Sequence, residues 1–188
     1  MSSERPLQQR IVAQAVELTV RDGWSSVTMG RLADAVGVSR QTVYNEIGSK
    51  PALAEAMVAR ELEQFLAAVR RAFDAHPDDL VEAVRAAARG VLQLARDNAL
   101  LQAIASASHG AASDLLPLLT THSGSLLVAA EDVVRERVAA YAVPLDGAQA
   151  AVVVDAVVRL VLSHVTQPSA TPERTADDLA WLVSRLLG

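Results

Sequence analysis

The chain has 188 residues, is 51% hydrophobic and carries a net charge of −5, with only 9 Gly, 7 Pro and two each of Phe, Tyr and Trp. This composition favours helices over sheets and supplies enough apolar surface for one core and a small satellite domain, so we expect an all-α protein. The absence of cysteine excludes disulfides, thiolate metal sites and a Cys nucleophile.

The first fifty residues contain three short helical patterns, each followed by a glycine. Apolar residues recur at steps of three and four over 7–22, which predicts the first helix. A second helix is predicted over 29–36 with Thr28 as its N-cap, and a third over 40–47 with Ser39 as its N-cap. A three-residue turn joins these two short helices, as in a helix-turn-helix. Their predicted buried residues are Met29, Leu32, Ala33, Val36, Val43 and Ile47.

The rest of the chain is predicted to consist of longer helices separated by proline, glycine and asparagine. We expect nine or ten helices in all, in a helix-turn-helix domain over 1–50 and a helical domain over 51–188. The later helices are expected to cover 50–76, 78–97, 98–108, 113–142 with a break near Pro117 and Gly124, 148–166 and 173–187.

The acidic charge is concentrated in the second domain. Residues 1–50 carry six basic side chains against five acidic ones, whereas residues 51–188 carry eleven against seventeen. A mildly positive head on an acidic body fits DNA binding at one small surface. The chain shows no uncharged apolar run of the roughly 18 to 20 residues that a membrane span needs, and no apolar signal core near residue 1. We therefore expect a cytoplasmic protein without a membrane partner.

Residues 28–50, TMGRLADAVGVSRQTVYNEIGSK, meet the geometric needs of a helix-turn-helix, with small Ala33 at the helix crossing and a polar outer face on the last helix. They closely resemble the DNA-binding region of the TetR family of transcriptional regulators. The resemblance covers about residues 7–54, and beyond them only the helical layout and the length are similar. The family pattern is met by Thr28, Leu32-Ala33, Gly37-Val38-Ser39, Thr42, Tyr44 and Lys50.

The resemblance implies a role for most residues of the third helix. Arg40 and Gln41 would reach base edges in the major groove, where Arg suits guanine and Gln suits adenine. Thr42 and Tyr44 would contact the DNA backbone and thymine methyl groups, and the Ser39 hydroxyl a phosphate. The predicted DNA-binding set is Thr28, Ser39, Arg40, Gln41, Thr42, Tyr44, Asn45 and Lys50.

Lys50 is the only lysine of the chain, at the position where the family places a phosphate-binding lysine. The N-terminus of the following helix would attract the same anion. The sequence departs from the common family pattern at Met29, Glu46 and Ile47. Ile47 is a benign core exchange, and Met29 removes one hydroxyl. Glu46 can accept from a cytosine amino group, pair with an Arg or point away from the DNA.

The second domain, by the same resemblance, binds a ligand and forms a dimer through its last two helices. Its aliphatic composition and few aromatic residues favour an acyl or alkyl effector over a planar cation. The candidate pocket residues are Val69, Phe73, Leu92, Leu101, Ile104, His109, Leu116, Leu119, His122 and Leu127. The candidate dimer residues are Val154, Val158, Val161, Leu162, Leu179, Trp181, Leu182 and Leu186.

Asp155 and Arg159 are four residues apart and can pair on one helix face, either at an interface or toward a ligand. No Gly-rich phosphate loop, metal-ligand spacing or Ser–His–acid arrangement occurs, so we expect no enzyme, no cofactor and no metal. The function predicted is a repressor that binds a palindromic double-stranded operator as a homodimer and is released by a hydrophobic small molecule. A helical ligand-binding or interaction module without DNA binding is the alternative, and the sign of regulation stays open.

Overall fold

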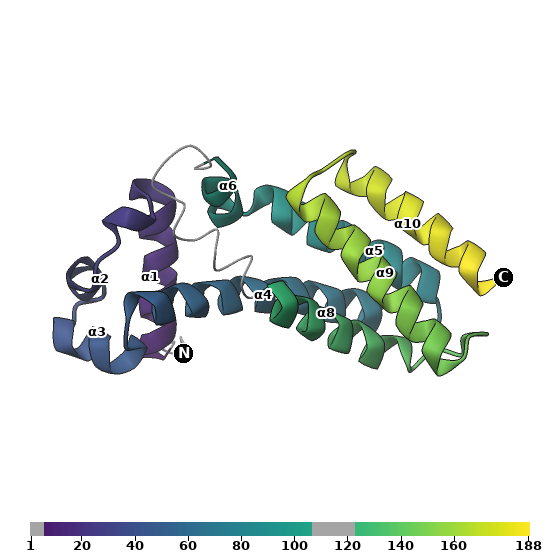
Figure 1. The fold of residues 1–188 in the computed structure, drawn as a ribbon, viewed down its shortest axis with the longest axis horizontal. Helices are drawn as coiled ribbons and strands as arrows, with labels where there is room; N and C mark the ends of the chain where they lie inside the picture. The colour runs from purple at the N-terminus through teal and green to yellow at the C-terminus, as the bar shows by residue number, and fades with distance from the viewer. Residues whose placement is uncertain (1–5, 107–122) are drawn as a thin grey trace. The chain divides into compact units, whose positions relative to one another are not determined.

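The computed structural model describes residues 6–106 and 123–188, which form nine α-helices, one short 3-10 helix and no strand (Figure 1). The predicted all-α fold is therefore confirmed. The part of the predicted 113–142 helix that precedes residue 123 lies outside the described residues. The elements are α1 (Leu7–Asp22), η1 (Trp24–Ser26), α2 (Met29–Val36), α3 (Arg40–Ile47), α4 (Lys50–Ala75), α5 (Leu80–Asp97), α6 (Ala99–Ser106), α8 (Ser123–Val138), α9 (Gly147–Thr166) and α10 (Pro172–Leu187).

The chain divides into two compact units, and the division differs from the predicted boundary at residue 50. Of the described residues, unit 1 comprises 6–61, 98–106 and 123, and unit 2 comprises 62–97 and 124–188. The first turns of α4 belong to unit 1 because Leu53, Ala54 and Met57 are buried in the same cluster as the helix-turn-helix core. The helix-turn-helix unit therefore needs residues well beyond 50 to complete its core.

The core of unit 1 follows the predicted helix faces. The largest fully buried side chains here are those of Ile11, Val27, Leu32, Val43, Leu53 and Met57. The turns between the helices are fixed by caps: the Thr28 hydroxyl accepts from the Arg31 amide at 3.2 Å, and the Ser39 hydroxyl accepts from the Thr42 amide at 3.0 Å. Gly37 ends α2 in the left-handed conformation, with φ of 75°, which residues with a Cβ adopt at a cost. Both predicted N-caps are confirmed.

Unit 2 is built around α5, which packs against both α9 and α10. Its main cluster includes Phe73, whose ring meets that of Tyr141 edge to face at 6.0 Å between centroids. The Tyr141 hydroxyl donates to the His76 carbonyl at 2.7 Å, and burial raises the pKa of this tyrosine. Phe73 is buried, and Phe65 and Tyr141 are partly buried in the same cluster, so all three belong to the core of unit 2.

α9 differs from the other helices because it is both apolar and largely exposed to solvent. A capping box begins this helix. The Asp146 Oδ1 accepts from the Gln149 backbone N–H at 2.8 Å, and the Gln149 Oε1 accepts from the Asp146 backbone N–H at 3.0 Å. Val154 and Val158 are buried, whereas Val152 is 68% exposed. Among the described residues, α9 is the one helix long and apolar enough to cross a membrane, and only 11% of its apolar window is buried.

The end of α1 is tied to α2 by charge. The Arg21 guanidinium donates to the Asp22 carboxylate at 3.0 Å and 3.1 Å, and Arg31 donates to the same carboxylate and to the Ser26 carbonyl. These hydrogen bonds, from Arg21 first and Arg31 second, lower the pKa of Asp22 from 3.8 to about 2. The ionised carboxylate is therefore the form that holds the turn together.

Replacing Asp22 by Asn should destabilise the protein at pH 7 and do so less as the pH falls. A carboxyl group with a lowered folded-state pKa stabilises above its unfolded value and loses that contribution as the pH drops toward about 2. Urea unfolding of wild type and Asp22→Asn between pH 7 and pH 2 measures the difference. High salt should reduce it, since the group is exposed. A difference independent of both pH and salt would contradict the assignment.

Candidate nucleic-acid interface

The candidate recognition surface is the outer face of α3. Val43 and Ile47 are buried in the core of unit 1, so the helix has one fixed orientation within that unit. The residues of the opposite face are polar and exposed, as predicted for a helix that enters a groove. They are Arg40, Gln41, Tyr44 and Asn45.

These four exposed side chains form two pairs, each between neighbouring turns of α3. The Gln41 Nε2 donates to the Asn45 Oδ1 at 3.0 Å. The Arg40 Nη2 donates to the Tyr44 hydroxyl at 3.4 Å, and the guanidinium carbon lies 5.6 Å from the centre of the Tyr44 ring. A spacing of four residues permits such contacts on a helix, but the sequence pattern was interpreted residue by residue and did not predict them.

Two hydroxyl groups of the predicted set, those of Thr28 and Ser39, cap α2 and α3. Ser39 and Thr42 share a hydrogen bond of 2.8 Å between their hydroxyl oxygens. Thr28 is exposed at the start of α2, and Thr42 is partly buried. Among the residues that depart from the family pattern, Glu46 is exposed on α3, whereas Met29 and Ile47 are buried in the core. Contacts of these hydroxyl groups with phosphate remain predictions.

Lys50 begins α4 and is tied to the connection between α1 and α2. Its Nζ donates to the Trp24 carbonyl at 3.0 Å and lies 4.7 Å from the centre of the Trp24 ring. Trp24 is 4% exposed, so the ammonium rests on a buried indole, a favourable cation–π arrangement. The ammonium has three N–H donors, and the Trp24 carbonyl uses one of them. Lys50 therefore has a structural role that the sequence did not reveal, and donors remain for an anion.

The predicted ligand-pocket residues fall into different parts of the chain. Val69, Phe73 and Leu92 are buried in unit 2, and Leu127 is partly buried on α8. Leu101 and Ile104 lie on α6, in unit 1. His109, Leu116, Leu119 and His122 lie outside the described residues.

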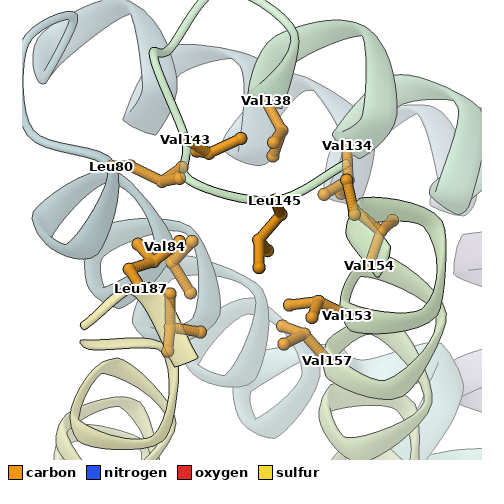
Figure 2. Close-up of a pocket in the computed structure, with 12 residues that line it drawn as sticks. Leu80, Val84, Val134, Val138, Val143, Leu145, Val153, Val154, Val157 and Leu187 are labelled. Atoms are coloured by element: carbon orange, nitrogen blue, oxygen red, sulfur yellow. The ribbon is translucent and has the colours of Figure 1, made fainter. Parts of the chain in front are cut away.

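A cavity of about 40 Å³ lies elsewhere in unit 2, and none of the predicted pocket residues lines it. Figure 2 shows Leu145, from the segment between α8 and α9, pointing into this space toward aliphatic side chains of the surrounding helices. The lining residues are Leu80, Val84, Val134, Val138, Val143, Leu145, Ala150, Val153, Val154, Val157, Val183 and Leu187. Periodicity did not find this cavity because its walls come from three separate stretches of the sequence, residues 80–84, 134–157 and 183–187.

The predicted dimer residues divide into inward and outward sets. Val154, Val158 and Leu179 are buried within the single chain, because they pack against other helices of unit 2. Val161 and Leu182 are partly buried. Leu162, Trp181 and Leu186 are exposed, Trp181 to 61%, and the Arg185 guanidinium lies 5.9 Å from its ring centre. Three of the eight predicted residues are therefore exposed in the single chain.

A helix-turn-helix with a polar, exposed recognition helix defines a DNA-binding protein. Residues 11–57 match the model for bacterial regulatory proteins of the tetR family, and residues 79–185 match that for the tetracyclin repressor C-terminal domain. The chain belongs to the TetR family, and it is a ligand-responsive, DNA-binding transcriptional regulator.

Individual relatives agree with this assignment. The chain is 30% identical over 184 residues to the HTH-type transcriptional regulator AlkX of Mycobacterium tuberculosis, covering 97% of this chain and 86% of the relative. The crystal structure of the TetR family repressor AlkX from Dietzia sp. strain DQ12-45-1b, implicated in biodegradation of n-alkanes, superposes with a TM-score of 0.76 at 25% identity, covering 99% and 97% of the chains. A transcriptional regulator from Rhodococcus sp. RHA1 shares the fold, with a TM-score of 0.61 at 18% identity over 97% and 96%.

Replacing Lys50 by Met should lower the free energy of unfolding without DNA by about 0.5–2 kcal/mol, because the bond to the Trp24 carbonyl and the cation–π contact are both lost. The same change should shift the emission of Trp24, measured in a Trp181→Phe background where Trp24 is the only tryptophan. Lys50→Arg is the matched control that keeps the charge. Unchanged stability and emission, with weakened DNA binding alone, would mean that Lys50 serves only as a phosphate ligand.

Proposed function

We propose that this chain is a cytoplasmic repressor that binds a palindromic operator as a homodimer and leaves it when a hydrophobic alkyl compound binds. It acts by binding alone and catalyses no reaction. The observation that carries the proposal is the exposed polar face of α3, held by a buried opposite face. An Arg and a Gln at the start of such a helix suit guanine and adenine in the major groove.

A second copy of the chain is the partner we propose for α9 and α10. The exposed apolar side chains here are those of Val152, Leu160, Leu162, Trp181 and Leu186, more than an isolated soluble chain ordinarily leaves in water. A membrane is the other apolar environment for α9. Asp155 and Arg159 lie in the middle of that helix, where insertion costs about 2.5–3.5 kcal/mol for each charge. A partner helix is the more favourable environment.

The effector we propose is a saturated alkyl chain that enters the cavity of unit 2. All twelve lining residues are aliphatic, which favours hydrocarbon over a charged or aromatic ligand. A relative that is implicated in n-alkane biodegradation supports the same class of compound. At about 40 Å³ the cavity holds one or two methylene groups, whereas an apolar cavity of about 150 Å³ admits benzene. Ligand binding must therefore widen it, and this supplies the structural change.

The coupling to DNA follows from operator geometry. Two helix-turn-helix units on one palindrome must lie about 34–36 Å apart or a multiple of that distance. A ligand that favours a state in which the two units have a different spacing weakens DNA binding at both half-sites together. A tenfold loss of DNA affinity requires about 1.4 kcal/mol of coupling, and DNA must then weaken ligand binding equally.

The test of the function is binding to the intergenic DNA beside the chain's own gene. We expect specific binding to an inverted repeat there, and Arg40→Ala should cost about 1–3 kcal/mol and relax preference at one base position. An n-alkane titrated into the labelled complex should release the protein. Ala150→Val adds two methyl groups to the cavity and should weaken release, whereas Leu145→Ala should strengthen it, with Leu94→Ala as a control outside the lining.

The outcomes of this test separate the parts of the proposal. Absence of specific DNA binding would support the alternative, a helical ligand-binding module. DNA binding without alkyl release would reject the effector. If an n-alkane released wild type and both cavity variants from DNA equally, the cavity would be rejected as the effector site. Lower transcription of the regulated genes in a strain without this gene, rather than higher transcription, would make the protein an activator.

Dimerisation has its own test by sedimentation. Wild type should sediment at twice 19.9 kDa at micromolar concentration. Val152→Glu and Trp181→Glu should each give monomers, because they place a charge in the proposed apolar contact. Val128→Glu is the matched control, since Val128 is 54% exposed on α8, outside the proposed interface. A wild-type monomer would contradict the dimer, and a monomeric Val128→Glu variant would move the interface to α8.

A further inference from the structure

Four of the exposed residues of α3 contact each other in pairs between successive turns of the helix. Arg40 and Gln41 lie in the first turn, and Tyr44 and Asn45 contact them from the next. We propose that Tyr44 and Asn45 are positioning residues that fix the donor groups of Arg40 and Gln41 for base recognition. This inference rests on the proposed function, in which α3 binds the operator.

The contact between Gln41 and Asn45 determines which way the Gln41 amide faces. A glutamine recognises adenine by accepting from the N6 amino group and donating to N7, which requires both ends of its amide in one plane with the base. The Gln41 Nε2 has two N–H bonds, and Asn45 Oδ1 accepts one of them at 3.0 Å. The other N–H and the Oε1 remain for the base. Asn45 thus favours the amide orientation with Oε1 directed away from it.

Tyr44 acts on Arg40 by a different contact. The guanidinium carbon lies 5.6 Å from the ring centre, within the range of a cation–π interaction, and the hydroxyl accepts from Nη2 at 3.4 Å. An arginine has five N–H donors, so this hydroxyl leaves enough for both acceptors of guanine. The ring restricts a long side chain that is otherwise free in water.

Restricting these side chains before binding increases discrimination between bases. Arg and Gln are among the side chains that lose most rotamer freedom when they are immobilised. A side chain already held near its bound orientation loses less on binding, and it also adapts less readily to a wrong base. Asn45 and Tyr44 therefore should affect the ratio of affinities for right and wrong bases, and not only the affinity itself.

The experiment uses the full chain and the operator obtained by selection from a random DNA library. Affinities are then measured for this operator and for its single-base variants at the two half-site positions whose preference Gln41→Ala and Arg40→Ala abolish. Asn45→Ala should reduce discrimination about threefold or more at the Gln41 position and leave the Arg40 position unchanged. Tyr44→Leu should do the reverse. Tyr44→Phe, which keeps the ring, should retain most of the discrimination.

Two controls separate positioning from direct contact. Asn45→Asp keeps an acceptor for the Gln41 Nε2 but adds a negative charge near DNA, so overall affinity should fall while discrimination stays. In a Gln41→Ala background, Asn45→Ala should have no further effect on discrimination. Circular dichroism checks that each variant is folded, and Ala is favourable in a helix.

Two results would overturn the inference. One is an equal loss of affinity for all operator variants in Asn45→Ala and Tyr44→Leu, which is the behaviour of phosphate contacts. The other is an additive effect of Asn45→Ala in the Gln41→Ala background, which means that Asn45 contacts a base itself. Failure of wild type to select any operator would instead reject the proposed function.

Discussion

The structure depends on one helix that belongs to two hydrophobic cores. α4 is 26 residues long, and Leu53 and Met57 near its start are buried with the helix-turn-helix, whereas Val69 and Phe73 near its end are buried in unit 2. Its only proline, Pro51, lies in the first turn, where the missing N–H costs nothing, and it contains no glycine. The interior of α4 therefore contains neither of the residues that commonly kink a helix.

A buried carboxylate marks the point where α4 passes from one unit to the other. Glu61 is 9% exposed, and its Oε2 accepts from the Asn98 Nδ2 at 2.5 Å. The Asn98 Oδ1 in turn accepts from the Leu101 amide at 2.9 Å and so caps α6. Removing either partner would leave a polar group buried without its bond, which costs more than the bond itself contributes. The start of α6 is thereby fixed to α4 within unit 1.

The helices were predictable because local signals and burial agreed. Thr28, Ser39 and the glycines after each short helix set the helix ends, and the apolar period set the faces. What could not be predicted depends on distant segments meeting. The Lys50 contact with Trp24 joins residues 26 apart, and the cavity joins three separate stretches of the sequence. The unit boundary also differs from the prediction, because Leu53 is buried with the helix-turn-helix core. The sequence motif ends near residue 50, whereas the residues that complete its core extend further along α4.

Two charges of α9 bear on the proposal that this apolar, exposed helix packs against a second copy of the chain. The Arg159 Nε donates to the Asp155 Oδ1 at 2.7 Å, so the predicted pair forms. With both side chains about half exposed, such a pair contributes little to stability, and the acid preceding the base by four residues suits the helix dipole. Burying one unpaired charge is strongly unfavourable, whereas a pair made within one helix carries its own partner into the contact. In the proposed dimer, the partner surface would therefore not have to neutralise either charge of this pair, although burying the pair still costs its desolvation.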